Sequence, residues 1–390
     1  MQAKIDSVLS KAVADGAVAA VSAVVCNTDG IVYEGAFGQR GPDGDAMRVD
    51  TVGAIMSMTK AITGAAAMQL VEQGKLDLDA PAGEICPYLG EAQVLTGYDD
   101  EGHPTFRPPM RPVTLKNLLT HTSGFVYDIW NPDFRRFLAS TGQPSVTTLK
   151  KAALEVPLMF DPDERWEYGI GIDWVGQMVE AVSGLTLGEY FKKYLTGPLG
   201  MHDTAFHPTQ DMLEKLAVMR VRLQDGSLVV PPAEPPIPET SEPEFEMGGG
   251  GLLSSAADYA RFLRMMLSGG ALDGVKVLSP ETVAKMSVNH IGDLRVVNLP
   301  SADQTLSQDA EFFPGDPKSW GLTYQINEIP GFTGRPAGTL MWAGLSNCYY
   351  WIDRENDVAG VFLTQVLPFA DASCLQTYYD FETLVYRELR

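Results

Sequence analysis

Residues 57–71 read SMTKAITGAAAMQLV, and this stretch differs from a surface helix in two ways. From Ala61 to Val71 it has no charged residue, whereas a helix at a protein surface shows a polar face. We therefore predict a helix that begins near Ser57, ends before Gly74 and is buried on nearly all sides. In addition, a serine stands at its N-terminal end and a lysine follows one turn later, so a charged group enters a buried helix.

Ser57 and Lys60 form an S-x-x-K pair. Residues three apart on a helix share a face, so Lys60 Nζ can reach Ser57 Oγ. A serine hydroxyl becomes a good nucleophile when a neighbour takes its proton, and burial lowers the pKa of a lysine so that its neutral amine can do this. The pair alone fits a capping serine and a solvated lysine equally well. The charge-free helix that follows favours the chemical interpretation.

The two ends of the chain predict a single antiparallel sheet. The residues before Gly16 have the apolar spacing of an amphipathic helix, and two β-branched stretches then flank the turn signal Asp29-Gly30. Three more strands follow near the C-terminus, where their short connections require antiparallel neighbours, and a final helix ends the chain. We expect the first and last helices to cover one face of the sheet. The expected strands are 18–26, 31–39, 338–344, 347–353 and 358–365, and the last helix is about 371–388.

The middle of the chain has helical patterns after a Pro-, Gly- and charge-rich excursion at 86–115. We predict an α/β plus α fold: residues 1–85 and 206–390 form an α/β domain with a central antiparallel sheet, residues 86–205 form a mostly helical domain, and the active site lies between them. The Pro-rich segment 231–244 should run over the surface. The helices expected in the middle are 114–120, 133–140, 147–155 and 173–183.

Composition excludes several classes of partner. The formal net charge of −21 repels phosphate backbones and anionic membrane surfaces, so neither nucleic acid nor a membrane is an expected partner. The N-terminus lacks the pattern of a signal peptide, and no apolar run approaches the ~18 residues of a membrane span, which predicts a cytoplasmic protein. The four cysteines are scattered and should be free thiols. The histidines form no metal-binding pattern, and we expect no metal and no cofactor.

Two later motifs complete a recognisable set: Tyr168 in WEYGI at 166–170, and Trp342-Ala343-Gly344 at the end of a strand. With S-x-x-K, and in this order, they resemble the penicillin-recognising serine hydrolases of the class C β-lactamase fold, which carry S-x-x-K, then Y-x-N, then K-T-G. The segments LVEQGKLDLDAP, LLTHTSG and GGGGLLSSAADYARF are also similar to that family, so the resemblance covers roughly residues 5–388. The W-x-G form is typical of the family VIII carboxylesterases.

The resemblance implies roles for these residues. Ser57 would attack a carbonyl carbon and become acylated, while Lys60 and Tyr168 share the proton transfers. Tyr168 is favoured as the base, with its pKa lowered by the nearby lysine, although which of the two is the base stays open. The backbone N–H groups of Ser57 and Leu345 would form the oxyanion hole.

Departures from the β-lactamase motifs indicate the substrate. Trp342 replaces a lysine that would hold a substrate carboxylate, and Ile170 replaces an asparagine that would bind an amide. Both changes leave an apolar wall, so we expect hydrolysis of neutral esters with short to medium acyl chains. The resemblance also places Gly344 and Tyr127 beside the substrate. A β-lactamase or D-amino-peptidase, an acyltransferase and a silent binding protein remain alternatives, and the sequence leaves a homo-oligomer open.

Overall fold

The fold centres on one seven-stranded antiparallel sheet. The computed structural model describes residues 1–231 and 243–389, so most of the Pro-rich segment expected at the surface lies outside the described residues. All neighbouring strands of the sheet are antiparallel, as predicted. The strand order is β11 (Lys318–Trp320), β12 (Gln325–Asn327), β13 (Leu340–Gly344), β14 (Cys348–Asp353), β15 (Val358–Leu363), β1 (Ala20–Cys26) and β2 (Ile31–Gly38).

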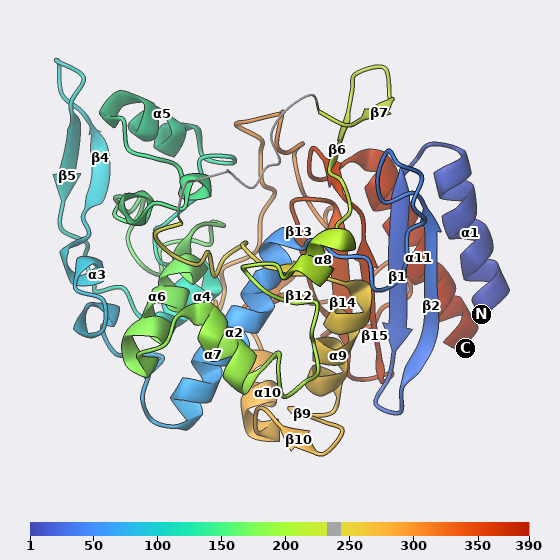
Figure 1. Ribbon diagram of the computed structural model, residues 1–390. Coiled ribbons are helices and arrows are strands. Elements are labelled where there is room, and N and C mark those ends of the chain that lie inside the picture. The colour runs from blue at the N-terminus through green and yellow to red at the C-terminus, as the bar shows by residue number, and fades with distance from the viewer. Residues whose placement is uncertain (232–242, 390) are drawn as a thin grey trace.

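Helices cover both faces of this sheet. The first helix, α1 (Gln2–Ala14), packs against the last, α11 (Ala372–Leu389), and the two lie together on one face (Figure 1). On that side Trp351 of β14 packs against Phe381 of α11. The opposite face is covered by α9 (Ala256–Leu267), which contacts β1, β14 and β15. This arrangement confirms the predicted antiparallel sheet flanked by helices.

The charge-free helix is buried as the sequence predicts. It runs from Thr59 to Glu72 as α2, and every residue from Thr59 to Leu70 is buried. Gly74 follows its end with a φ of +65°, the left-handed conformation that glycine tolerates. Ser57 lies just ahead of α2, in the single 3₁₀ turn Met56–Met58.

The region between residues 86 and 205 contains most of the remaining helices, although its standing as a separate domain stays a prediction. The helix predicted at 147–155 is wrong: two 3₁₀ turns occur instead, because Leu149 adopts a left-handed conformation after a run of β-branched residues. The excursion at 86–115 holds a β-hairpin that the sequence did not reveal. The elements are α3 (Tyr88–Glu91), β4 (Val94–Tyr98), β5 (Pro104–Arg107), α4 (Leu115–Thr120), α5 (Pro132–Thr141), α6 (Gly171–Ser183) and α7 (Leu187–Tyr194).

Short helices and strands in other parts of the chain complete the structure. They are α8 (Gln210–Glu214), α10 (Pro280–Met286) and the two- or three-residue strands β3 (Gly53–Ala54), β6 (Arg220–Arg222), β7 (Leu228–Val229), β8 (Leu253–Ser254), β9 (Ala271–Leu272), β10 (Val275–Lys276) and β16 (Val366–Leu367). All four cysteines are buried free thiols, as expected. Within the described ranges no helix has the length and apolar character needed to cross a membrane; the cytoplasmic location stays a prediction.

Candidate active site

The predicted nucleophile and its lysine lie within hydrogen-bonding distance. Ser57 is partly exposed, and its Oγ is 3.1 Å from Lys60 Nζ. The residue before it, Met56, has a φ of +48°, which is uncommon for a non-glycine residue and marks a strained turn ahead of the serine. The geometry expected from the S-x-x-K spacing is confirmed.

Lys60 is fully buried, yet its amine has three polar neighbours. Besides Ser57 Oγ, Nζ is 3.0 Å from the Tyr127 hydroxyl and donates to the Gly249 carbonyl oxygen at 2.6 Å. Burial lowers the pKa of Lys60 to about 7, and the charge of Asp173 opposes this shift. A substantial fraction of this amine is therefore neutral near pH 7 and able to accept a proton.

Tyr168 lies against the same lysine. Lys60 Nζ is 4.7 Å from the centre of the Tyr168 ring, and the Tyr168 hydroxyl accepts a 3.0 Å hydrogen bond from Trp342 Nε1. The expected lowering of the Tyr168 pKa is wrong. Burial raises the pKa of this hydroxyl, and the opposing hydrogen bonds from Ser57 and Trp342 do not offset it. Tyr168 is therefore a neutral hydroxyl at physiological pH.

The end of β13 brings a second backbone donor close to the nucleophile. Neither the Ser57 N–H nor the Leu345 N–H donates a hydrogen bond to any residue that the structure describes. A Cβ added to Gly344 would lie 2.2 Å from the Ile55 carbonyl oxygen, so only glycine allows this close approach. The two N–H groups predicted to form an oxyanion hole are thus both available.

Two polar side chains that no sequence motif indicated, Gln365 and Ser346, hold the segment before Ser57 against the end of β13. Gln365 Oε1 accepts from the Ala54 N–H at 2.9 Å, while its Nε2 donates to the Ala54 carbonyl oxygen at 3.1 Å. Ser346 Oγ donates to the same carbonyl at 2.7 Å. The segment that leads to Ser57 is therefore tied to the end of the sheet.

The residues predicted to touch substrate are buried, but only some of them take part in hydrogen bonds of the site. Tyr127 and Trp342 both belong to the hydrogen-bond network of Lys60 and Tyr168, so Trp342 is more than the apolar wall expected at its position. Ile170 is 1% exposed at the N-cap of α6, and its contact with substrate stays a prediction. Aromatic rings of Trp130, Trp166, Trp320 and Phe312 surround this cluster.

Asp173 is the polar member of the site that sequence reasoning missed. It lies in the first turn of α6 and is fully buried. Its Oδ1 accepts from the Gly249 N–H at 2.7 Å, and burial raises its pKa to about 6. Its pattern in the sequence is that of an ordinary acid near a helix N-terminus, so no signal pointed to the active site.

His121 and the glycine run 248–251 have structural roles next to the site, as expected. His121 Nδ1 accepts from the Gly169 N–H at 3.3 Å, and burial lowers its pKa well below 6.5, so the ring is neutral. It holds the backbone next to Tyr168. The glycine run packs closely on α2, where Gly248 O accepts from Thr63 Oγ1 at 2.7 Å.

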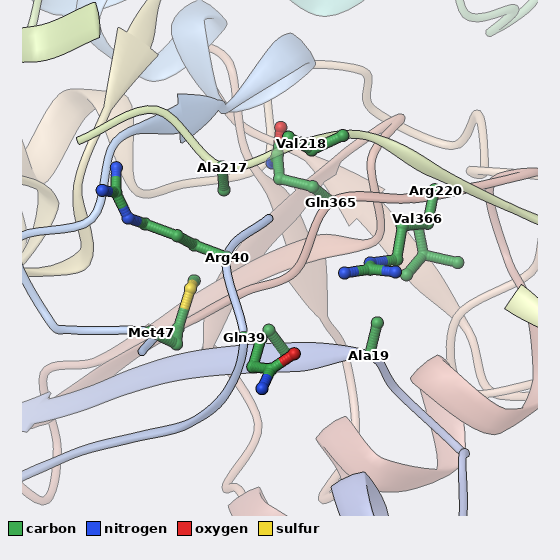
Figure 2. Close-up of a pocket in the computed structure, with 10 residues that line it drawn as sticks. Ala19, Gln39, Arg40, Met47, Ala217, Val218, Arg220, Gln365 and Val366 are labelled. Carbon is green, nitrogen blue, oxygen red and sulfur yellow. The ribbon is translucent and has the colours of Figure 1, made fainter. Parts of the chain in front are cut away.

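Neither the two cavities described below nor the distribution of possible metal ligands indicates a second active site in the described residues. Figure 2 shows one small cavity, where Gln365 lies near Arg220 and Val366; another is lined by Trp342 and Phe312. Each has a volume of about 10 Å³, room for one water molecule, and neither is lined by Ser57. No group of three or more His, Cys, Asp or Glu side chains within the described parts could hold a metal ion.

Comparisons with known proteins show which proteins this chain is similar to. The family model described as Beta-lactamase matches residues 5–384. Lovastatin esterase from Penicillium rubens is 35% identical over 369 residues, 89% of each chain. Monacolin J acid methylbutanoyltransferase from Aspergillus terreus is 29% identical, covering 88% of this chain and 83% of the relative. The structure of a simvastatin synthase mutant from Aspergillus terreus superposes with a TM-score of 0.85 at 27% identity, covering 99% of this chain and 97% of that one.

Proposed function

Because the chain belongs to the β-lactamase family, we propose that it is a serine hydrolase that cleaves carboxylic esters through an acyl-enzyme on Ser57. One observation carries the proposal: a fully buried lysine, with its pKa lowered to about 7, has its amine 3.1 Å from a partly exposed serine hydroxyl. This arrangement activates a nucleophile at neutral pH.

Acylation begins with Lys60 as the base. As Ser57 Oγ bonds to the ester carbonyl carbon, its proton moves to the lone pair of Lys60 Nζ, and the carbonyl π electrons move to the carbonyl oxygen. The N–H groups of Ser57 and Leu345 stabilise that oxyanion. Tyr168 does not take this role, because burial raises the pKa of its hydroxyl and keeps it protonated at neutral pH.

The tetrahedral intermediate then collapses. The carbonyl re-forms, the bond to the alcohol oxygen breaks, and that oxygen takes a proton from the Tyr168 hydroxyl, which Lys60 reprotonates. This leaves Lys60 neutral and Ser57 acylated. A water molecule then attacks the acyl carbon and gives its proton to Lys60, and Ser57 leaves with that proton as the carboxylic acid forms.

The substrate is proposed to be a neutral ester with a short to medium acyl chain. The position that would hold a substrate carboxylate carries Trp342, whose indole N–H is engaged by Tyr168. Aromatic side chains dominate the surroundings, and apolar pockets tolerate a range of acyl chains. The relative named lovastatin esterase supports ester cleavage as the activity.

Acyl transfer is a second candidate, and the relatives favour it. One carries the name monacolin J acid methylbutanoyltransferase, and a solved neighbour is a simvastatin synthase. Both reactions share the same acyl-enzyme and differ only in whether water or another nucleophile attacks it. β-Lactam or D-amino-peptide hydrolysis has less support, since Trp342 and Ile170 stand where the polar recognition groups are expected.

A fluorophosphonate probe tests the proposed nucleophile without knowledge of the substrate. We expect wild-type protein to be labelled covalently, the adduct to map to the peptide that contains Ser57, and Ser57→Ala to remain unlabelled. Labelling of Ser57→Ala to the wild-type level, or a wild type that does not react, would refute the assignment.

A further inference from the structure

Ala54, three residues before Ser57, lies in the two-residue strand β3. One edge of β3 pairs with β8, and the Ile55 N–H extends this pairing by donating to the Leu252 carbonyl oxygen at 3.1 Å. Successive residues of an antiparallel strand direct their N–H and C=O groups to opposite edges. Both backbone groups of Ala54 therefore face the other edge of β3, where no strand of the described residues joins this two-stranded sheet.

The carboxamide of Gln365 takes the place of a strand at this edge. Its Oε1 accepts from the Ala54 N–H at 2.9 Å, and its Nε2 donates to the Ala54 carbonyl oxygen at 3.1 Å. The other Nε2 hydrogen goes to the Thr364 carbonyl oxygen at 2.5 Å, which also accepts only, so the orientation of the amide is fixed. A Cβ on Gly53 would lie 2.8 Å from the Gln365 carboxamide carbon, so the segment before Ala54 packs directly on this side chain.

Ser346 reaches the same carbonyl from the turn that carries the second oxyanion donor. It follows Leu345 in the turn between β13 and β14, is fully buried, and donates from Oγ to the Ala54 carbonyl oxygen at 2.7 Å. Thr364 Oγ1 donates to the carbonyl oxygens of Ser346 and Asn347 at 2.9 and 3.0 Å. The two residues after β15 thus hold both sides of the junction, Thr364 the turn and its neighbour Ala54.

This junction joins the two halves of the oxyanion hole. The N–H groups of Ser57 and Leu345 come from separate segments, and each must lie within about 3 Å of the same developing oxyanion. We propose that Gln365 and Ser346 are positioning residues: by holding Ala54, they set the separation between these two N–H groups. We call the three residues the Ala54 clamp. The proposal rests on the proposed function of Ser57.

The Ala54 clamp contains no group that changes charge near neutral pH. An amide, a hydroxyl and a peptide group do not titrate there, and burial raises the pKa of the neighbouring Cys348 thiol, 3.1 Å from Ser346 Oγ, to about 11. Loss of the clamp should therefore slow the reaction without moving the pH at which Lys60 loses its proton. This distinguishes an effect on the oxyanion hole from an effect on the base.

Two variants open the clamp from opposite sides. Gln365→Met keeps an unbranched side chain of similar length but removes both hydrogen bonds to Ala54, and Ser346→Ala removes the third. We expect the rate constant for fluorophosphonate labelling of Ser57 to fall roughly tenfold to hundredfold in each variant, the range for a small displacement of a catalytic group.

The labelling reaction gives a readout that simple loss of structure would not reproduce. The phosphonyl oxygen takes the place of the ester carbonyl oxygen, so the rate constant depends on the oxyanion hole, whereas the final extent of labelling counts the chains with a competent Ser57. A displaced oxyanion hole lowers the rate constant and leaves the extent as in wild type. Partial unfolding lowers the extent, and the folded chains still react at the wild-type rate.

Gln69→Met is the matched control. Gln69 is a buried glutamine near the other end of α2, and its Nε2 donates to the carbonyl oxygens of Val277 at 2.9 Å and Tyr194 at 3.2 Å. The same substitution therefore removes two hydrogen bonds from a buried amide to the backbone, away from the clamp. Its rate constant, extent of labelling and pH profile should equal those of wild type.

The outcomes separate the two proposals. A wild type that is not labelled overturns both. With a labelled wild type, the clamp alone is overturned if Gln365→Met and Ser346→Ala react at the wild-type rate, if Gln69→Met loses as much rate as they do, or if the acid limb of their pH profiles moves. If Gln365→Met does not fold, Ser346→Ala decides: a reduced rate constant with full labelling and an unshifted limb supports the clamp, and a wild-type rate constant overturns it.

Discussion

The indole nitrogen of Trp342 donates a 3.0 Å hydrogen bond to the hydroxyl of Tyr168. In the resembling β-lactamases a lysine is expected at this tryptophan position. An indole keeps a hydrogen-bond donor on the tyrosine but brings no positive charge that could stabilise a phenolate. Burial outweighs this hydrogen bond, so Tyr168 stays a neutral proton donor, whereas burial brings the pKa of Lys60 down to about 7 and makes its amine available as the base.

The pH dependence should report Lys60. Its pKa is lowered from 10.5 to about 7, so protonation inactivates the base as the pH falls through that value. We expect kcat/KM for an activated ester to rise about tenfold per pH unit on the acid side and to level off above about pH 7. Initial rates across this range in one buffer series measure it. A flat profile through neutrality would contradict Lys60 as the base.

Tyr168→Phe should slow poor leaving groups more than good ones. An alkoxide needs a proton to depart, whereas p-nitrophenolate does not, and Tyr168 is the proposed donor. We expect kcat/KM for an ethyl ester to fall about 10²–10⁴-fold, the range for general acid catalysis, and that for the matching p-nitrophenyl ester to fall far less. Equal losses on the two esters would show that Tyr168 is not the proton donor to the leaving group.

Gly344→Ala should impair the oxyanion hole. The new Cβ would lie 2.2 Å from the Ile55 carbonyl oxygen, so β13 must move away from the nucleophile and carry the Leu345 N–H with it. We expect kcat to fall about 10²–10³-fold, the cost of losing one such donor. Gly30→Ala is the control, since nothing lies within 4 Å of its added Cβ, and its kcat should be unchanged. A fully active Gly344→Ala would argue against Leu345 as a donor.

Acyl transfer can be measured by partition of the acyl-enzyme. If acylation limits the rate, adding an alcohol acceptor should leave p-nitrophenol release unchanged while part of the acyl group appears as a new ester. Product analysis by mass spectrometry measures the ratio of ester to acid. Absence of any new ester at high acceptor concentration would show that the acyl-enzyme reacts with water and not with that alcohol.

The sequence predicted the parts of the fold that carry strong periodic patterns. The hairpin of β1 and β2, the buried helix α2 and the strands β13 to β15 were all recognisable, because each combines a clear apolar pattern with a turn or cap signal. Strands β11 and β12 were missed, since three residues are too few to show a period of two. The false helix at 147–155 arose from a pattern that Leu149 interrupts by its backbone conformation.

The site divides in a similar way. Ser57 and Lys60 are three residues apart, so helix geometry alone brings them together, and the resemblance supplied Tyr168. Asp173 could not be found, because its connection to Lys60 runs through Gly249, 76 residues away in the chain. The direction of the Tyr168 pKa shift could not be predicted from the sequence either. It depends on the complete burial of the hydroxyl, next to a lysine whose own pKa is lowered by burial.

The central claim is that Ser57 is the nucleophile of an esterase. Initial rates on p-nitrophenyl butyrate and on a chromogenic cephalosporin, with wild type and Ser57→Ala from parallel preparations, test it most directly. We predict rapid ester cleavage by wild type, little turnover of the cephalosporin, and loss of ester cleavage in Ser57→Ala. Ester cleavage that survives the substitution would contradict Ser57 as the nucleophile; dominant cephalosporin turnover would keep Ser57 but contradict the ester specificity assigned to Trp342 and Ile170.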